Sequence, residues 1–298
     1  MEMNIEMAEG TFRFRLEKTK AVLTGCEIRS GALCIPGEVS GVPVTDIDKK
    51  AFWGQRNLKR VILPESIQNL GDWAFASCRN LEEVEFSGEH VVLGKQVFQN
   101  CPKLRRIARP GIHEDVTWLL GAVPKYMPEL YLMDMKDSER DSWLERWDAA
   151  LVRRLAEPDE EGFADQFMCG LENFGHQDNH TYKEERRREK CELSYLRLLH
   201  PYVLPEELRG KIRGYLLDYS KGGASEGAWN VLMENHGTDM DYVRLYRGLF
   251  DEAGTAFHLD EHLRDIGEDF PELKAYLLRG DKEESAGDGF FDALSLDV

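Results

Sequence analysis

The feature of this sequence that most constrains its fold is a repeat of 23 residues in the first third of the chain. The dipeptide Ala51-Phe52 returns in two later units, and three more registers keep the same spacing. The recurring positions are Ala74-Phe75 and Val97-Phe98, then Leu58, Leu81 and Leu104, then Val61, Val84 and Ile107, then Ile47, Leu70 and Leu93. A fixed period of about 20 to 29 residues is typical of a solenoid with one short strand per unit.

The same registers predict the core. Within each unit, the first leucine, the later valine or isoleucine and the aromatic residue are expected to point inward, so Phe52, Phe75 and Phe98 should stack as a ladder. Three units are near the minimum that can be stable, and open ends would expose unpaired strand edges. We therefore expect the amino-terminal strands to cover one end and the segment beginning at Asp115 to pack on the other.

The repeat units also resemble a known family. The stretches IDKKAFWGQRNLKRVILPESI (47 to 67), LGDWAFASCRNLEEVEF (70 to 86) and LGKQVFQNCPKLRRI (93 to 107) are similar to the units of BspA-like leucine-rich repeats. The resemblance covers about residues 11–108, because the lead-in strands also look like those that open such domains. It implies a leucine-rich solenoid and a binding role, and many family members are exported or displayed on cell surfaces.

Alternation along the short strands predicts which side chains lie on the outer face of this sheet. That face should carry Arg60 and Ile62, Glu83 and Glu85, Arg106 and Ala108, with Cys34 in the preceding strand. Side chains that stand in rows on a rigid sheet can be recognised by another protein, and we predict partner binding at Arg60, Ile62, Glu83, Glu85 and Arg106. The alternative is that these side chains are only solvated, because exposed charges need no further role.

The character of the chain changes near Arg109-Pro110-Gly111, a turn-forming stretch. Residues 1–110 carry 16 basic and 14 acidic side chains, whereas the remainder carries 22 and 41, and the formal net charge is -17. Beyond Ser138, apolar residues recur at helical spacing, which predicts short amphipathic helices packed in antiparallel pairs. The segments expected to be helical are 138–158, 191–201, 205–220, 225–237, 238–254 and 259–280.

The predicted fold is therefore α+β with two domains: a short leucine-rich-repeat β-solenoid at residues 1–110 and an acidic, all-helical domain at residues 111–280. The helix pairs weakly resemble degenerate ankyrin-type or other α-solenoid units, since Leu196, Trp229 and His262 lie 33 residues apart. Residues 281–298 are expected to form a flexible acidic tail. Its apolar residues are spaced like one face of a short helix that would dock on a partner, fold back or fray: Phe290, Phe291, Leu294 and Leu296.

Two groups of polar residues in the second half suggest more specific chemistry. Cys169, His176, His180 and Cys191 offer thiol and imidazole ligands suited to zinc, but their spacing fits no compact zinc motif, so we predict no metal site. The charged run from Glu184 to Lys190 is predicted to be a solvated helix face, in which Glu184 and Arg188 lie at i and i+4.

The sequence contains no Gly-rich phosphate loop, nucleophile elbow or HExxH, so we expect no catalytic residues and no cofactor. The negative charge disfavours nucleic acid, and no run of 18 apolar residues predicts a membrane span. Glu2, Glu6 and Glu9 replace the basic region of an export signal, and the six cysteines are interpreted as reduced thiols, so we expect a cytoplasmic location.

The predicted function is a non-catalytic protein-protein interaction module, an adaptor or scaffold whose partner is another protein, with no binding to nucleic acid or membrane. Two alternatives stay open. One is an enzyme with a site at the junction of the two domains, where clefts tend to form. The other is a surface adhesin exported by a route that the sequence does not reveal.

Overall fold

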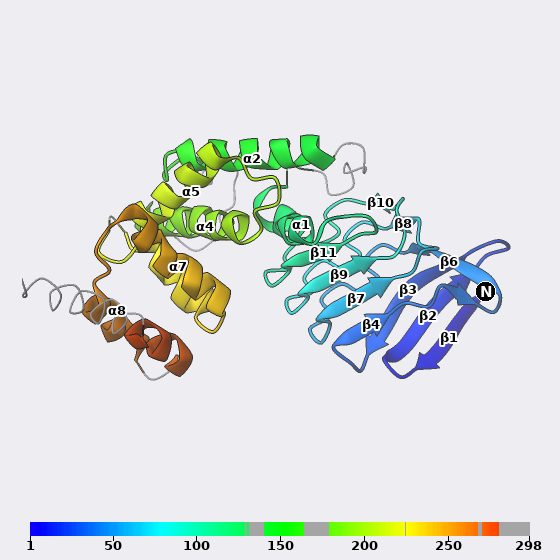
Figure 1. Ribbon diagram of the computed structural model, residues 1–298. Helices are drawn as coiled ribbons and strands as arrows, with labels where there is room; N and C mark the ends of the chain where they lie inside the picture. Colours follow the sequence, from blue (N-terminus) through cyan, green and yellow to red (C-terminus); the bar gives the residue numbers. More distant parts are fainter. Residues whose placement is uncertain (129, 131–139, 164–178, 224, 268–269, 280–298) are drawn as a thin grey trace, which may run out of the picture. The chain divides into compact units, whose positions relative to one another are not determined.

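The computed structural model of the chain describes all residues except 129, 131–139, 164–178, 224, 268–269 and 280–298 (Figure 1). It divides into two compact units, Met1–Ala150 and Leu151–Val298. The first unit contains the strands, and the second is helical throughout its described elements. The predicted succession of a β-solenoid and a helical region is thus confirmed.

The first unit is built from short strands that lie in rows (Figure 1). Their bounds are β1 (Glu2–Met7), β2 (Gly10–Leu16), β3 (Ala21–Ile28), β4 (Ala32–Cys34), β5 (Glu38–Val39), β6 (Val42–Ile47), β7 (Arg60–Leu63), β8 (Asn69–Leu70), β9 (Glu83–Phe86), β10 (Val92–Leu93) and β11 (Arg106–Ala108). One sheet has the order β1-β2-β3-β6-β8-β10, with β5 paired to β6, and a second has the order β11-β9-β7-β4. Within each repeat the chain passes from one sheet to the other, so that β6, β8 and β10 lie in the first sheet and β7, β9 and β11 lie in the second.

The parallel strands pair in a register equal to the sequence repeat. Arg60 of β7 lies opposite Glu83 of β9, and Glu83 lies opposite Arg106 of β11, each 23 residues further on. The same spacing relates Ile47, Leu70 and Leu93 across β6, β8 and β10. Because successive side chains of a strand point to opposite faces of the sheet, every second one, such as Val61, Val84 and Ile107, enters the core between the sheets.

The core contains the predicted aromatic ladder. The ring centroids of Phe52 and Phe75 are 4.8 Å apart, and those of Phe75 and Phe98 are 5.8 Å apart, with both pairs stacked. The thiols of Cys78 and Cys101 donate to the backbone carbonyl oxygens of Phe52 and Phe75, respectively. Burial raises the pKa of Cys78 to about 12 and that of Cys101 to about 11, so both remain thiols at neutral pH.

Both ends of the solenoid are covered as the sequence predicts. The antiparallel strands β1, β2 and β3 extend one sheet at the amino-terminal end, and helix α1 (Glu114–Tyr126) packs on β11 at the other. His113 caps α1 by accepting a hydrogen bond from the backbone N–H of Asp115 at 3.2 Å. Helix α1 belongs to the same compact unit as the solenoid, so this unit continues past residue 110. The division into folding domains at residue 110 stays a prediction.

Gly121 allows α1 to approach the last repeat. A Cβ atom at this position would lie 2.2 Å from the backbone carbonyl of Arg105, a contact that no side-chain adjustment can relieve. Gly121→Ala is therefore expected to destabilise the solenoid unit by more than about 1 kcal/mol, although alanine is the better helix former. Gly214→Ala is the matched control, because its Cβ would meet nothing within 4 Å. Thermal unfolding should show a lower midpoint for Gly121→Ala and an unchanged or higher one for Gly214→Ala; equal midpoints would contradict the packing.

The described helical elements are α2 (Arg140–Ala156), α4 (Asn179–Leu199), α5 (Glu206–Asp218), α6 (Gly227–Val231), the π-helical turn η2 (Leu232–His236), α7 (Met240–Ala253) and α8 (Leu259–Ile266), and residues 271–279 are also helical. Helix α4 contacts α5, α6 and α7 and is the central element of its unit. It begins at Asn179, so the start predicted at residue 191 is wrong. The helix predicted at 259–280 ends at Ile266, because Gly267 adopts a positive φ there.

The second unit has an aromatic core around a buried histidine. His262 is 1% exposed, and its ring stacks on Phe257 and meets Trp229 edge to face. Nδ1 lies 2.8 Å from the carbonyl oxygen of His258, which can only accept, so Nδ1 carries the proton. Nε2 therefore accepts from the hydroxyl of Tyr246 at 3.0 Å. Burial lowers the pKa of His262, and the nearby charge of Lys221 acts in the same direction.

Acidification is expected to destabilise the helical unit through His262. The pKa of His262 is lower in the folded chain than in the unfolded chain, where it is about 6.5. At pH values between these two pKa values, the unfolded chain therefore binds more protons than the folded chain. The contribution of His262 is therefore complete above about pH 6.5 and declines as the pH falls through that window. Urea unfolding at several pH values between about 7.5 and 5 measures the slope of the free energy of unfolding against pH. His262→Gln should reduce the slope and the exposed His180→Gln should leave it unchanged; a full slope in His262→Gln would refute the assignment.

Candidate functional site

The outer face of the sheet β4-β7-β9-β11, here called the strand face, carries every residue that the sequence assigns to it. Val61, Val84 and Ile107 point inward and are buried, whereas their neighbours in the strands are exposed or partly exposed. The outward side chains form two rows across the sheet. One row is Ala32, Arg60, Glu83 and Arg106, and the other is Cys34, Ile62, Glu85 and Ala108.

The charges of the strand face are paired with one another. Arg60 donates to Glu85 at 2.8 Å and lies 3.7 Å from Glu83. Arg106 lies 3.8 Å from Glu83 and donates to both carboxylate oxygens of Glu114, at 3.1 and 3.0 Å. The hydrogen bonds with Glu114 raise the pKa of Arg106, which therefore remains charged. The result is a continuous network of alternating charge that runs from β7 to the start of α1.

This network fixes side-chain directions more than it stabilises the fold. Partly exposed ion pairs typically contribute about 0–1 kcal/mol each. Yet a bidentate pair such as Arg106 with Glu114 restricts both side chains to one geometry. Glu114 is the member that the sequence analysis missed, because it follows the last repeat and has no counterpart at the 23-residue spacing. Its sequence signal is weak: an acidic residue in the first turn of a helix that caps the last strand.

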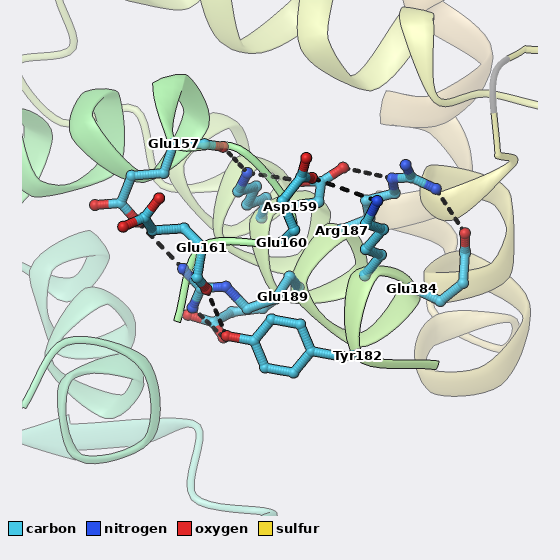
Figure 2. Close-up of polar contacts among 11 residues, drawn as sticks. Glu157, Asp159, Glu160, Glu161, Tyr182, Glu184, Arg187 and Glu189 are labelled. Carbon is cyan, nitrogen blue, oxygen red and sulfur yellow. Dashed lines mark hydrogen bonds and ion pairs between the residues drawn. The ribbon is translucent and has the colours of Figure 1, made fainter. Parts of the chain in front are cut away.

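A second charged cluster lies in the helical unit and corrects the prediction for residues 184–190. Lys190 is only 3% exposed, and its ammonium donates to the backbone carbonyl of Glu157 at 2.6 Å and to Asp159 at 2.8 Å. Figure 2 shows Arg187 between Asp159 and Glu184. The predicted solvated helix face is therefore wrong, because α4 is central to its unit and turns most of this run toward neighbouring segments.

The individual pairings in this cluster also differ from the predicted spacing. Glu184 pairs with Arg187 rather than with Arg188, which pairs with Glu234 at 2.9 Å. Burial works against ionisation of Asp159, but hydrogen bonds from Lys190 and Arg187 hold its pKa below the usual range. The carboxylate is thus charged at neutral pH and fully engaged in a structural network.

The four possible zinc ligands are not all described. Cys169 and His176 lie outside the described residues, as does the tail 281–298. His180 and Cys191 both belong to α4, where 11 residues correspond to about 16 Å along the axis, too far apart to share one ion. Within the described residues, no group of three or more His, Cys, Asp or Glu side chains could hold a metal ion. The described cysteines, Cys26, Cys34, Cys78, Cys101 and Cys191, are free thiols.

A stack of short parallel strands, in which each 23-residue unit adds one strand to each of two sheets, together with an internal Phe ladder defines a leucine-rich-repeat solenoid. Residues 40–117 match the family model of the BspA type leucine rich repeat region in 6 copies. The resemblance seen in the sequence is confirmed. Repeat regions of this family suggest a role in protein-protein interaction or surface adhesion.

Similar solved structures are bacterial leucine-rich repeat proteins. The one from T. pallidum is 27% identical, with a TM-score of 0.31, over 32% of this chain and 46% of that chain. The one from Bacteroides capillosus is 26% identical, with a TM-score of 0.31, over 39% and 91%. A leucine rich cell surface protein from Faecalibacterium prausnitzii is 22% identical, with a TM-score of 0.31, over 38% and 33%. This chain thus spans under half of the T. pallidum protein.

No curated protein matches the chain. Among the helices of the described residues, none combines the length and the apolar character needed to cross a membrane.

Proposed function

We propose that this protein is a non-catalytic protein-protein interaction module, an adaptor or scaffold, and that the strand face is its binding surface. The observation that carries the proposal is the ordered charge network on that face. Arg60, Glu83, Glu85 and Arg106 are held in fixed directions on a rigid sheet, with Ile62 beside them as an apolar contact. A partner with the complementary pattern would find these side chains already ordered, which lowers the entropy lost on binding.

The network determines how the proposal must be tested. Reversing only Arg60, Glu83 and Arg106 would place like charges beside Glu85 and Glu114, and so would disturb the face itself. We therefore reverse all five residues: Arg60→Glu, Glu83→Lys, Glu85→Lys, Arg106→Glu and Glu114→Lys. This inversion variant keeps the internal pairs and should unfold at nearly the same temperature as the wild type, because exposed pairs contribute little to stability.

The binding experiment compares the inversion variant with the intact chain. Proteins captured from a lysate of the source organism are identified, and the affinity of each purified candidate is measured. We expect the inversion variant to bind at least about tenfold more weakly, because like charges would then face each other across the interface.

The matched control for net charge is Glu89→Lys. Three acidic residues become basic and two basic residues become acidic in the inversion variant, so its formal net charge rises by two, as it does in the control. Glu89 is exposed in the turn after β9, away from the strand face. The control should bind like the wild type. Equal affinities of the inversion variant and the wild type would refute the strand face as the site.

We further propose that the interaction takes place in the cytoplasm. The free thiols of the described cysteines are in keeping with this location, because cysteines are kept reduced in the cytoplasm. Cell fractionation with an antibody to the chain tests the location. Recovery with the cytoplasmic fraction agrees with an adaptor, whereas recovery at the cell surface would favour the adhesin role instead.

A further inference from the structure

The turns that lead from one sheet of the solenoid to the other carry a second surface, separate from the strand face. We call it the Trp-Lys patch and define it by Lys49, Lys50, Trp53, Trp73 and Lys95. The ammonium group of Lys50 lies 4.5 Å from the ring centroid of Trp53 and 5.6 Å from that of Trp73, and the ammonium group of Lys49 lies 4.9 Å from Trp73. The cations therefore rest on the faces of two indole rings.

Two members of the patch, Lys50 and Trp73, share an unusual backbone conformation. Lys50, Trp73 and Gln96 occupy the same position in successive repeats, and all three adopt a left-handed conformation, with φ of 60°, 55° and 52°. Glycine and asparagine adopt this conformation most readily, and a bulky side chain is strained there. The indole N–H of Trp73 donates to the side-chain oxygen of Gln96 at 2.8 Å, which fixes the ring. Trp53 is 47% exposed, so an apolar ring surface faces water beside it.

The lysines of the patch lack acidic partners. Among the described residues, Lys49, Lys50 and Lys95 form no ion pair, in contrast to the arginines of the strand face. The carboxylate of Asp72, which precedes Trp73 in the sequence, accepts a hydrogen bond from the backbone N–H of Lys95. In a chain with a net charge of -17, three exposed lysines without acidic partners, two of them over the rings of Trp53 and Trp73, form a local site for a negatively charged group.

We propose that the Trp-Lys patch binds an acidic peptide segment of a partner protein, with Asp or Glu side chains against the lysines and an apolar side chain on the indole rings. Lysine ammonium groups act as point charges that suit carboxylates in varied positions. A carbohydrate would require planar polar groups for its hydroxyls, and the amide oxygen of Gln96 is already engaged by Trp73. A nucleic acid carries one negative charge on every nucleotide, and neutralising several of its phosphates would take more cations than the three lysines of the patch supply.

A random-peptide display library selected on the full-length chain tests this proposal. We expect enriched peptides to combine several Asp or Glu residues with an aromatic or large aliphatic residue. The double variant Lys49→Glu/Lys50→Glu and the single variant Trp53→Ser should each weaken the binding of a synthesised enriched peptide by roughly tenfold or more. The double variant Lys18→Glu/Lys103→Glu is the control, because it changes the net charge equally at exposed positions outside the patch.

A further variant separates binding from folding. Trp73→Asn places a residue that accepts the left-handed conformation at this position, so the melting temperature should stay close to that of the wild type while peptide binding is lost. Enriched peptides without excess acidic residues, or with unchanged affinity for the Lys49→Glu/Lys50→Glu variant, would overturn the proposal. Binding of tetragalacturonate or phosphatidylserine vesicles through the same lysines, without peptide binding, would overturn it in favour of another ligand class. Failure of the strand-face proposal would leave these results unaffected.

Discussion

Replacing Phe75 with alanine is expected to lower the free energy of unfolding of the solenoid unit by about 3–5 kcal/mol. Phe75 is fully buried and stacks on both Phe52 and Phe98, so its removal leaves a cavity in the middle of the ladder. In a solenoid, each repeat is stabilised mainly by its neighbours, and the central unit contributes to two interfaces. The substitution should therefore destabilise the repeats on both sides of the central one.

Urea unfolding of the full chain, monitored by far-UV circular dichroism, measures this effect. Trp53→Ala is the control, because it also removes an aromatic ring from the same turn region, but at a position that is 47% exposed. We expect that control to lose no more than about 1 kcal/mol. Similar losses for Phe75→Ala and Trp53→Ala would show that the ladder is not the core that the structure describes.

Replacing Lys190 with alanine is expected to cost about 3–5 kcal/mol in the helical unit, because it removes one partner of a buried ion pair. Asp159 is then left with a side chain that is only 10% exposed and with Arg187 as its remaining cation. The carbonyl oxygen of Glu157 also loses the hydrogen bond donated by Lys190. A buried carboxylate that loses one of its two cations and a carbonyl that loses a buried hydrogen bond both destabilise the folded state.

Lys183→Ala is the control for this experiment, because Lys183 pairs with Glu160 at 3.5 Å on a much more exposed part of α4. It should change the free energy of unfolding by about 1 kcal/mol or less. The single variant Asp159→Asn and the double variant Lys190→Ala/Asp159→Asn complete a double-mutant cycle. The losses of unfolding free energy in the two single variants should sum to more than the loss in the double variant. Strictly additive losses would indicate that the two residues do not interact.

Much of the solenoid and of the strand face could be predicted because lateral neighbours in a solenoid are separated by one repeat. The 23-residue spacing therefore converts positions in the sequence into contacts between strands, as with Arg60, Glu83 and Arg106. Alternation along each strand then decides which side chain is buried, and Val61 and Val84 are buried as expected. Stacking of Phe52, Phe75 and Phe98 follows from the same register.

The helical unit was less predictable, because its contacts join segments with no shared period. The burial of Lys190 depends on Asp159, 31 residues earlier in the sequence, and the pairing of Arg188 depends on Glu234, 46 residues later. Local spacing within α4 could not reveal either partner. It predicted an exposed face because it considered only charges on the same helix.

The repeat length, the core ladder and the residues of the strand face all follow from periodicity along the chain, so the amino-acid sequence is enough to predict them. The pairing of the charges, in contrast, depends on the folded structure. The fold brings Glu114 of α1 against Arg106 and pairs the arginines and glutamates of the strand face. It places Lys49 and Lys50 over the rings of Trp73 and Trp53, without acidic partners among the described residues. The physical reason is that burial and electrostatic pairing depend on distances in space, which periodicity specifies only where the chain repeats itself.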